Sequence, residues 1–154
     1  MEGSGVGPLN ELEGVTVFFG TFEHTLDAKG RLIVPALFRS EFNGGGFITW
    51  HQTGCLALWT KEDFRVKGEE MSELGRSSRS EDLSIARRFF QGVSEVEIDK
   101  QGRFLTTPKA REFARISHEI FILGMGNRIE LWNPAHYELV TTSASEVFGA
   151  EITE

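Results

Sequence analysis

The chain carries one short motif twice, and this repetition constrains its fold more than any other feature. The first copy runs from Glu23 to Pro35 and the second from Glu95 to Pro108. In both copies an apolar residue precedes an aspartate, two residues intervene, and Gly-Arg then opens another apolar run. The aspartate, glycine and arginine of one copy are all separated from those of the other by the same sequence offset. A duplicated unit of this length predicts one compact body built from two similar halves.

Each motif has the composition of a strand, a tight turn and a second strand. Apolar Phe22 and Leu26 alternate with polar residues before the first aspartate, which is the two-residue period of a half-buried strand. Asp favours the first position of a type I turn, and Gly favours the left-handed position three residues later. Such a turn makes a hairpin with a bulge. We therefore expect the apolar runs after Arg31 and Arg103 to be return strands, each followed by a helix that begins near a proline.

Two interpretations of this turn follow from its residues. In the structural one, aspartate and arginine simply pair across the bulge, Asp27 with Arg31 in the first copy. In the functional one, Lys29 and Arg31 flank Gly30 at a hairpin tip, and two copies place two cationic tips on one surface. That arrangement suits phosphates or the edges of bases.

Longer stretches around the motifs resemble a known family. Residues 26–39, Leu-Asp-Ala-Lys-Gly-Arg-Leu-Ile-Val-Pro-Ala-Leu-Phe-Arg, resemble the opening of the MraZ family of bacterial transcriptional regulators. Residues 98–112 are similar to that family's second repeat. The segments 55–59 and 128–132, which each close a repeat, agree with it. The resemblance covers about residues 17–145.

The resemblance implies an α+β, mainly β fold of the swapped-hairpin (AbrB/SpoVT-like) type. This is a barrel of two tandem pseudo-symmetric repeats with short covering helices, in which the repeats stand in for the two subunits of a dimer. It also implies assembly into a ring of several chains. The family binds short direct repeats in double-stranded DNA upstream of the division and cell-wall gene cluster, mostly as a repressor. A cytoplasmic, nucleoid-associated protein without cofactor or small-molecule substrate is therefore expected.

The family's Asp-x-x-x-Arg motif falls on two pairs in this chain, Asp27 with Arg31 and Asp99 with Arg103. The second turn has Gln101 where the first has a lysine, so the two tips need not contact DNA equally. The expected DNA-binding residues are Lys29, Gly30, Arg31, Lys100 and Arg103. The expected turn-positioning residues are Asp27, Asp99 and Gly102.

Composition along the chain suggests how it is divided. Residues 1–14 hold four glycines and one proline. Thr60 to Asp63 resembles a capping box, which predicts a helix to about Gly75 and then a second helix from Ser80 or Glu81. The expected segments are a disordered extension (1–16), the first repeat (17–62), a helical connector (63–92), the second repeat (93–136), and a C-terminal helix with an acidic tail (137–154).

The formal net charge of −7 at first argues against nucleic acid, because DNA affinity comes largely from lysines and arginines that neutralise phosphates. All 16 basic residues lie between Lys29 and Arg128, whereas seven of the 23 acidic residues lie outside residues 17–132. That central segment therefore holds 16 basic and 16 acidic residues. A neutral single chain binds DNA weakly, but a ring that presents many cationic tips gains affinity through multivalency.

Other classes of protein are disfavoured. Cys55 is the only cysteine and has apolar neighbours, which predicts a buried structural thiol and no intramolecular disulfide. The four histidines lack partners at metal-ligand spacing. An enzyme in which Asp27 and Asp99 share a proton is disfavoured because cationic residues follow each aspartate. The sequence contains no run of about 20 apolar residues that would predict a membrane span. Residues 1–16 lack the pattern of a secretory signal.

A module that binds other proteins remains an alternative. One protein of this class would be an antitoxin whose C-terminal tail neutralises a toxin. Such antitoxins commonly have one short repeat and a tail, whereas most of this chain is two complete repeats.

Overall fold

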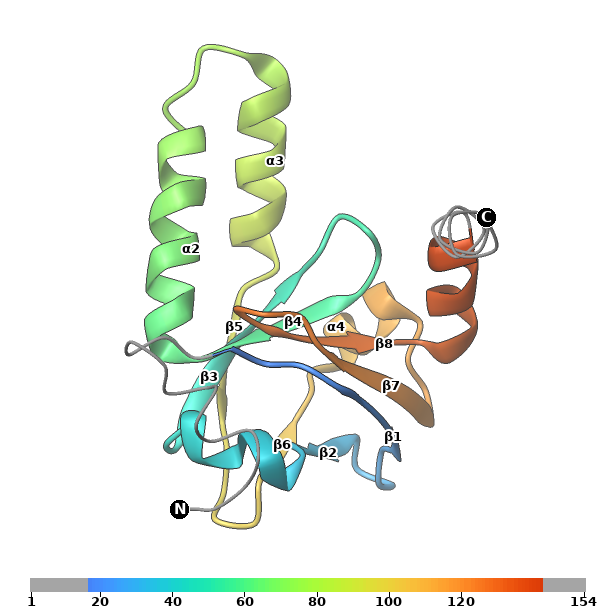
Figure 1. The fold of residues 1–154 in the computed structure, drawn as a ribbon. Coiled ribbons are helices and arrows are strands. Elements are labelled where there is room, and N and C mark those ends of the chain that lie inside the picture. Colours follow the sequence, from blue (N-terminus) through green and yellow to red (C-terminus); the bar gives the residue numbers. More distant parts are fainter. Residues whose placement is uncertain (1–16, 143–154) are drawn as a thin grey trace, which may run out of the picture.

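The computed structural model describes residues 17–142 and has an α+β fold with a mostly antiparallel sheet (Figure 1). The expected disorder of residues 1–16 and the expected acidic tail after residue 142 lie outside the described residues. Six strands form the sheet in the order β1-β7-β8-β4-β3-β5, and β2 and β6 form a separate two-stranded ribbon. The strand bounds are Thr21–Thr25 (β1), Arg31–Ile33 (β2), Gly45–Trp50 (β3), Leu56–Trp59 (β4), Ser94–Glu97 (β5), Arg103–Leu105 (β6), Glu119–Gly124 (β7) and Ile129–Trp132 (β8).

Strands from the two halves of the chain pair with one another. β1 from the first half pairs with β7 from the second, β5 pairs with β3, and β2 pairs with β6, all antiparallel. The prediction that the run after each turn returns along the preceding strand is therefore wrong. The turn forms, but β2 takes β6 as its partner because Leu32 and Phe104, opposite each other in this register, are both buried in the common core.

The short helices after β2 and β6 differ. The helix expected near the first proline is a 3-10 helix, η2 (Ala36–Glu41), and its N-cap residue, Pro35, makes no side-chain hydrogen bond. Phe38 in this helix and Phe42 at its C-cap are buried, and the Phe18 ring lies 5.1 Å from Phe38 and 5.7 Å from Phe42, centroid to centroid. The second helix, α4 (Pro108–Ala114), is α-helical and is capped by Thr107, which accepts a hydrogen bond from the backbone N–H of Ala110.

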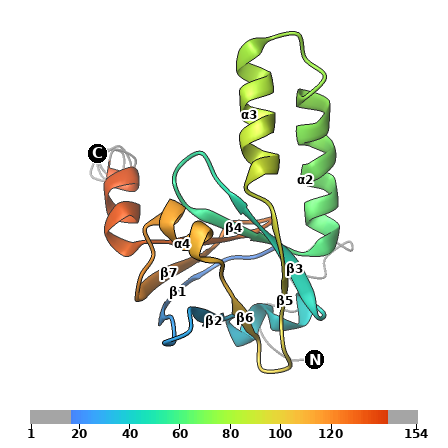
Figure 2. The ribbon, with the colours of Figure 1, turned by 180° about the vertical axis from the view of Figure 1, so that it is seen from behind.

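A helical hairpin, α2 (Lys61–Leu74) and α3 (Ser80–Gln91), projects from the sheet on the side opposite the β2–β6 ribbon (Figure 1 and Figure 2). Thr60 caps α2 by accepting a hydrogen bond from the N–H of Asp63 at 3.0 Å, which confirms the predicted helix start. The Phe64 ring stacks on Phe47 of β3 at 4.1 Å. Residues 134–142 form the last described helix. No helix within residues 17–142 is long and apolar enough to cross a bilayer.

Candidate nucleic-acid interface

The first turn is organised by the carboxylate of Asp27. Its Oδ1 accepts hydrogen bonds from the backbone N–H groups of Lys29 (2.8 Å) and Arg31 (2.9 Å), and its Oδ2 accepts one from Nε of Arg31 (2.8 Å). Gly30 completes the turn with a φ of 83°. The backbone N–H and then the side chain of Arg31 lower the pKa of Asp27 to about 2. The carboxylate is therefore ionised at neutral pH and holds the arginine next to it.

The second turn repeats this geometry. Asp99 accepts hydrogen bonds from the backbone N–H groups of Gln101 (2.9 Å) and Arg103 (2.8 Å) and from Nε of Arg103 (2.9 Å). The backbone N–H of Arg103 is the largest cause that lowers the pKa of Asp99. Gly102 has a φ of 84°. Because each carboxylate is bonded to its own arginine, the two aspartates do not share a proton.

Pairing with aspartate leaves part of each guanidinium available. Only Nε bonds to the carboxylate, and the terminal NH2 groups of Arg31 and Arg103 make no hydrogen bond to other residues of the described part of the chain. The side chains remain 38% and 41% exposed, respectively. The salt bridge thus orients each arginine without using all of its donors. Lys29 and Lys100, at the same two turns, are exposed.

The β2–β6 ribbon brings both arginines to one face. Arg31 lies opposite Leu105, and Ile33 lies opposite Arg103. Successive side chains of a strand point to opposite faces, and the middle pair, Leu32 and Phe104, is buried. The outward face of the ribbon is therefore formed by Arg31, Ile33, Arg103 and Leu105, and its two aliphatic side chains are 40% and 55% exposed. The turns lie at opposite ends of this ribbon (Figure 1).

Sequence reasoning missed four residues of this region. The alternation of β2 and β6 would have placed Ile33 and Leu105 beside the arginines, but only if the pairing of the two strands had been known. Arg39 and Arg111 pack against the tip glycines Gly102 and Gly30, respectively. The repeat offset that relates the two motifs relates these two arginines as well, and this was the signal that could have identified them.

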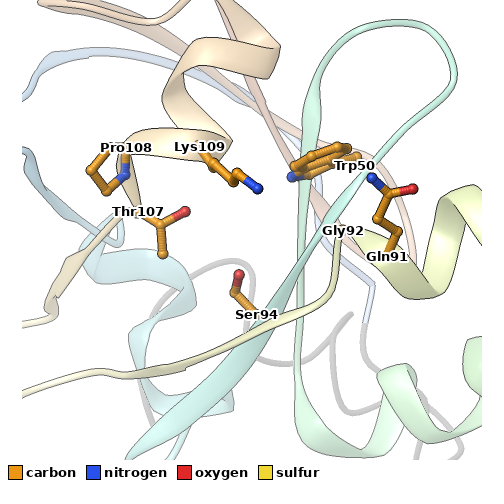
Figure 3. A pocket seen from close by; sticks show the side chains of 7 residues that line it. All are labelled: Trp50, Gln91, Gly92, Ser94, Thr107, Pro108 and Lys109. Carbon is orange, nitrogen blue, oxygen red and sulfur yellow. The ribbon is translucent and has the colours of Figure 1, made fainter.

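Two cavities lie away from the tips. A pocket of about 370 Å³ opens between β3, the start of β5 and the start of α4, and Figure 3 shows the Lys109 amine directed toward the same space as the Trp50 ring. Its lining residues are Trp50, Gln91, Gly92, Ser94, Thr107, Pro108 and Lys109. A larger cavity of about 870 Å³ lies between the α2–α3 hairpin and the β3–β4 turn. Neither lining includes a carboxylate or a tip residue.

The described residues provide neither a reactive thiol nor a metal site. Cys55 is buried as predicted, and burial raises the pKa of its thiol to about 12. The thiol is therefore protonated at neutral pH and is not a nucleophile. Within residues 17–142 no group of three or more His, Cys, Asp or Glu side chains is placed to hold a metal ion.

Comparison with known proteins agrees with the repeat. The family described as "MraZ protein, putative antitoxin-like" matches residues 17–84 and 89–151. A protein of Pediococcus pentosaceus named transcriptional regulator MraZ is 34% identical over 132 residues, which is 86% of this chain and 92% of the relative. Proteins of the same name from Moorella thermoacetica (33% identity, 87% and 93% coverage) and Finegoldia magna (36%, 84% and 90%) are similar over much the same extent.

Proposed function

The chain belongs to the MraZ family, and from this premise we propose that it is a sequence-specific DNA-binding regulator of transcription. The observation that carries the proposal is the outward face of the β2–β6 ribbon, where Arg31 and Arg103 stand together, each oriented by its own aspartate. The related proteins are named transcriptional regulators, which is not a class of enzyme.

The fold proposed for this function is a swapped-hairpin barrel. The exchange of strand partners between the halves, β1 with β7 and β5 with β3, supports it. In this proposal residues 17–62 and 93–136 are the two repeats and residues 63–92 connect them. The two halves then act as the two subunits of a dimer would, with one tip from each.

The proposed contact uses the donors that the aspartates leave available. Arg31, held at Nε by Asp27, presents its terminal NH2 groups to a base edge or a phosphate, and Lys29 contacts phosphate. Arg103 and Lys100 do the same at the other end of the ribbon. Arginine suits this role because its planar fork binds two acceptors at once, such as O6 and N7 of guanine.

The proposed partner is double-stranded DNA with short direct repeats upstream of the division and cell-wall gene cluster, and the proposed outcome is repression. Residues 17–132 are electrically neutral in sum, so one chain supplies little non-specific affinity. A ring of several copies places equivalent tips on successive repeats and gains affinity through multivalency. In this proposal the protein is cytoplasmic and associates with the nucleoid.

The experiment that tests the proposal measures binding to DNA from immediately upstream of the protein's own gene, with scrambled DNA as control, across a salt series. We expect the wild type to prefer the upstream DNA and Arg31→Ala to lose that preference while its oligomeric state is unchanged. Arg76→Ala, which removes an exposed arginine near the far end of α2, serves as the matched control and keeps the preference. If the wild type does not distinguish the two DNAs, the proposal is wrong, and a protein partner becomes the better hypothesis.

A further inference from the structure

The tip of the first half is packed against an arginine of the second half. A Cβ atom built on Gly30 would lie only 2.8 Å from Cζ of Arg111, so the flat guanidinium fills the space where any other residue would carry a side chain. Nη1 of Arg111 donates hydrogen bonds to the backbone oxygen and to Oγ1 of Thr106, the latter at 2.8 Å. Oγ1 of Thr106 in turn donates to the carbonyl oxygen of Gly30 at 2.9 Å. Arg111 and the first tip are thus joined through one buried hydroxyl.

The tip of the second half is packed against the equivalent arginine of the first half. A Cβ atom built on Gly102 would lie 2.9 Å from Cδ and 3.0 Å from Cζ of Arg39. Nη2 of Arg39 donates to the carbonyl oxygen of Val34 at 3.1 Å, and the backbone N–H of Val34 donates to the carbonyl oxygen of Gly102 at 2.8 Å. Since the same sequence offset relates Arg39 to Arg111 and Gly30 to Gly102, this is one contact made twice.

Neither arginine has a carboxylate as its ion-pair partner within residues 17–142. The hydrogen bonds that hold the two guanidinium groups go to the chain segments at the ends of β2 and β6. Both side chains are partly buried, and each blocks the space beneath one turn. Their geometry therefore restricts where a tip glycine, and with it the next residue, Arg31 or Arg103, can lie.

We propose that Arg111 and Arg39 are positioning residues that act across the two halves of the chain. Arg111 sets the tip that carries Arg31, and Arg39 sets the tip that carries Arg103. A substitution of the arginine in the helix of one half therefore changes the DNA contact made by the tip of the other half. The consequence for DNA rests on the proposed function, whereas the consequence for the tips of the free protein does not.

The first test uses the free protein and measures amide hydrogen exchange with residue-level fragmentation. In Arg111→Ala we expect faster exchange in the turn 27–31 and unchanged exchange in the turn 99–103. In Arg39→Ala we expect the reverse. Lys109→Ala, which removes an exposed cation from the same helix α4, should change neither turn. Equal effects on both turns, or an effect confined to the variant's own half, would overturn the proposal whatever the protein binds.

The second test is a pair of double-mutant cycles on DNA affinity. We expect Arg111→Ala to weaken binding by about 10-fold, as does removal of a hydrogen bond made by a charged group. This loss should be much smaller when Arg31 is already alanine and persist in full when Arg103 is alanine. If the loss is the same in both backgrounds, Arg111 contacts DNA directly or acts on the whole fold, and the proposed positioning role is wrong. If the wild type shows no DNA preference, the proposed function fails while the exchange test still decides the positioning role.

Discussion

The two tips have the same turn and different supports. Both aspartates accept three hydrogen bonds from equivalent donors, which are the backbone N–H groups two and four residues later and Nε of the arginine. The carbonyl oxygen of Gly30, however, accepts from both the N–H and the hydroxyl of Thr106, whereas that of Gly102 accepts from the N–H of Val34. The short motif has thus kept its internal geometry while its surroundings have diverged.

The helices that follow β2 and β6 differ in the residue that caps them. Pro35 and Thr107, which are equivalent in the repeat, occupy the same N-cap position. Thr107 offers a hydroxyl that bonds a free N–H of the first turn, and Pro108 follows it at the first helical position, where proline is well suited. Pro35 has no such side-chain oxygen, and its helix is a 3-10 helix. Pro108 therefore lies one residue later in its repeat than Pro35 does, because Thr107 occupies the N-cap position. The spacing between the turn and the N-cap is the same in both repeats.

The largest expected effect comes from filling the space beneath a tip. Gly30→Ala and Gly102→Ala should each lower the free energy of unfolding by about 2–4 kcal/mol, because a left-handed backbone is strained for alanine and the arginine beneath must leave its hydrogen bonds. Gly126→Ala is the matched control, since its φ is 80° and a Cβ there meets nothing within 4 Å. Denaturant unfolding measures the difference. If Gly126→Ala lowers the free energy of unfolding as much as the tip variants do, displacing the arginines has no cost.

The next effect separates the supports of the two tips. Thr106→Val gives the second half the residue found at the equivalent Val34. It removes the hydroxyl between Arg111 and Gly30, and we expect a loss of about 1–2 kcal/mol in unfolding free energy, since the two hydrogen bonds of this buried hydroxyl are lost. Thr106→Ser keeps the hydroxyl and should recover most of this loss. Equal unfolding free energies for the two variants would show that the hydroxyl does not stabilise the first tip.

Acid should weaken both turns together. Asp27 has its pKa lowered from 3.8 to about 2 and the pKa of Asp99 is also lowered, so their contribution to stability is complete above about pH 4. It is lost as the pH falls through the folded pKa values toward about 2. We expect Asp27→Asn and Asp99→Asn each to make thermal stability less dependent on pH in this acid range. An unchanged acid dependence in both variants would exclude the turns as its source.

The smallest expected effect concerns the position of the lysine, which the first tip carries at Lys29 and the second at Lys100. Gln101→Lys gives the second turn the lysine that the first has at Lys29. If each tip contacts phosphate, the dependence of DNA affinity on salt should become steeper by about one unit of the log–log slope, and Lys29→Gln should make it shallower by a similar amount. The measurement is a titration at several salt concentrations. A slope that responds to only one of the two substitutions would show that the tips contact DNA unequally.

Much of the local structure could be predicted from residue types. The capping of α2 by Thr60 and of α4 by Thr107, the buried Cys55, and the turn chemistry of both motifs depend on groups close together in the sequence. The outward positions of Ile33 and Leu105 could not be read in the same way. They depend on which strand β2 pairs with and on the packing beneath it.

The sequence by itself determined the turns, because a carboxylate and the three donors next to it in the chain need no distant partner to form their hydrogen bonds. It also determined, through the repeat, that the two halves carry the same turn. Only the tertiary structure decided that β2 pairs with β6 and that Arg39 and Arg111 lie beneath the opposite tips. The physical reason is that so short a strand has no local preference for a partner. β2 pairs with β6 because this pairing buries Leu32 in a core formed by apolar side chains from both halves of the chain.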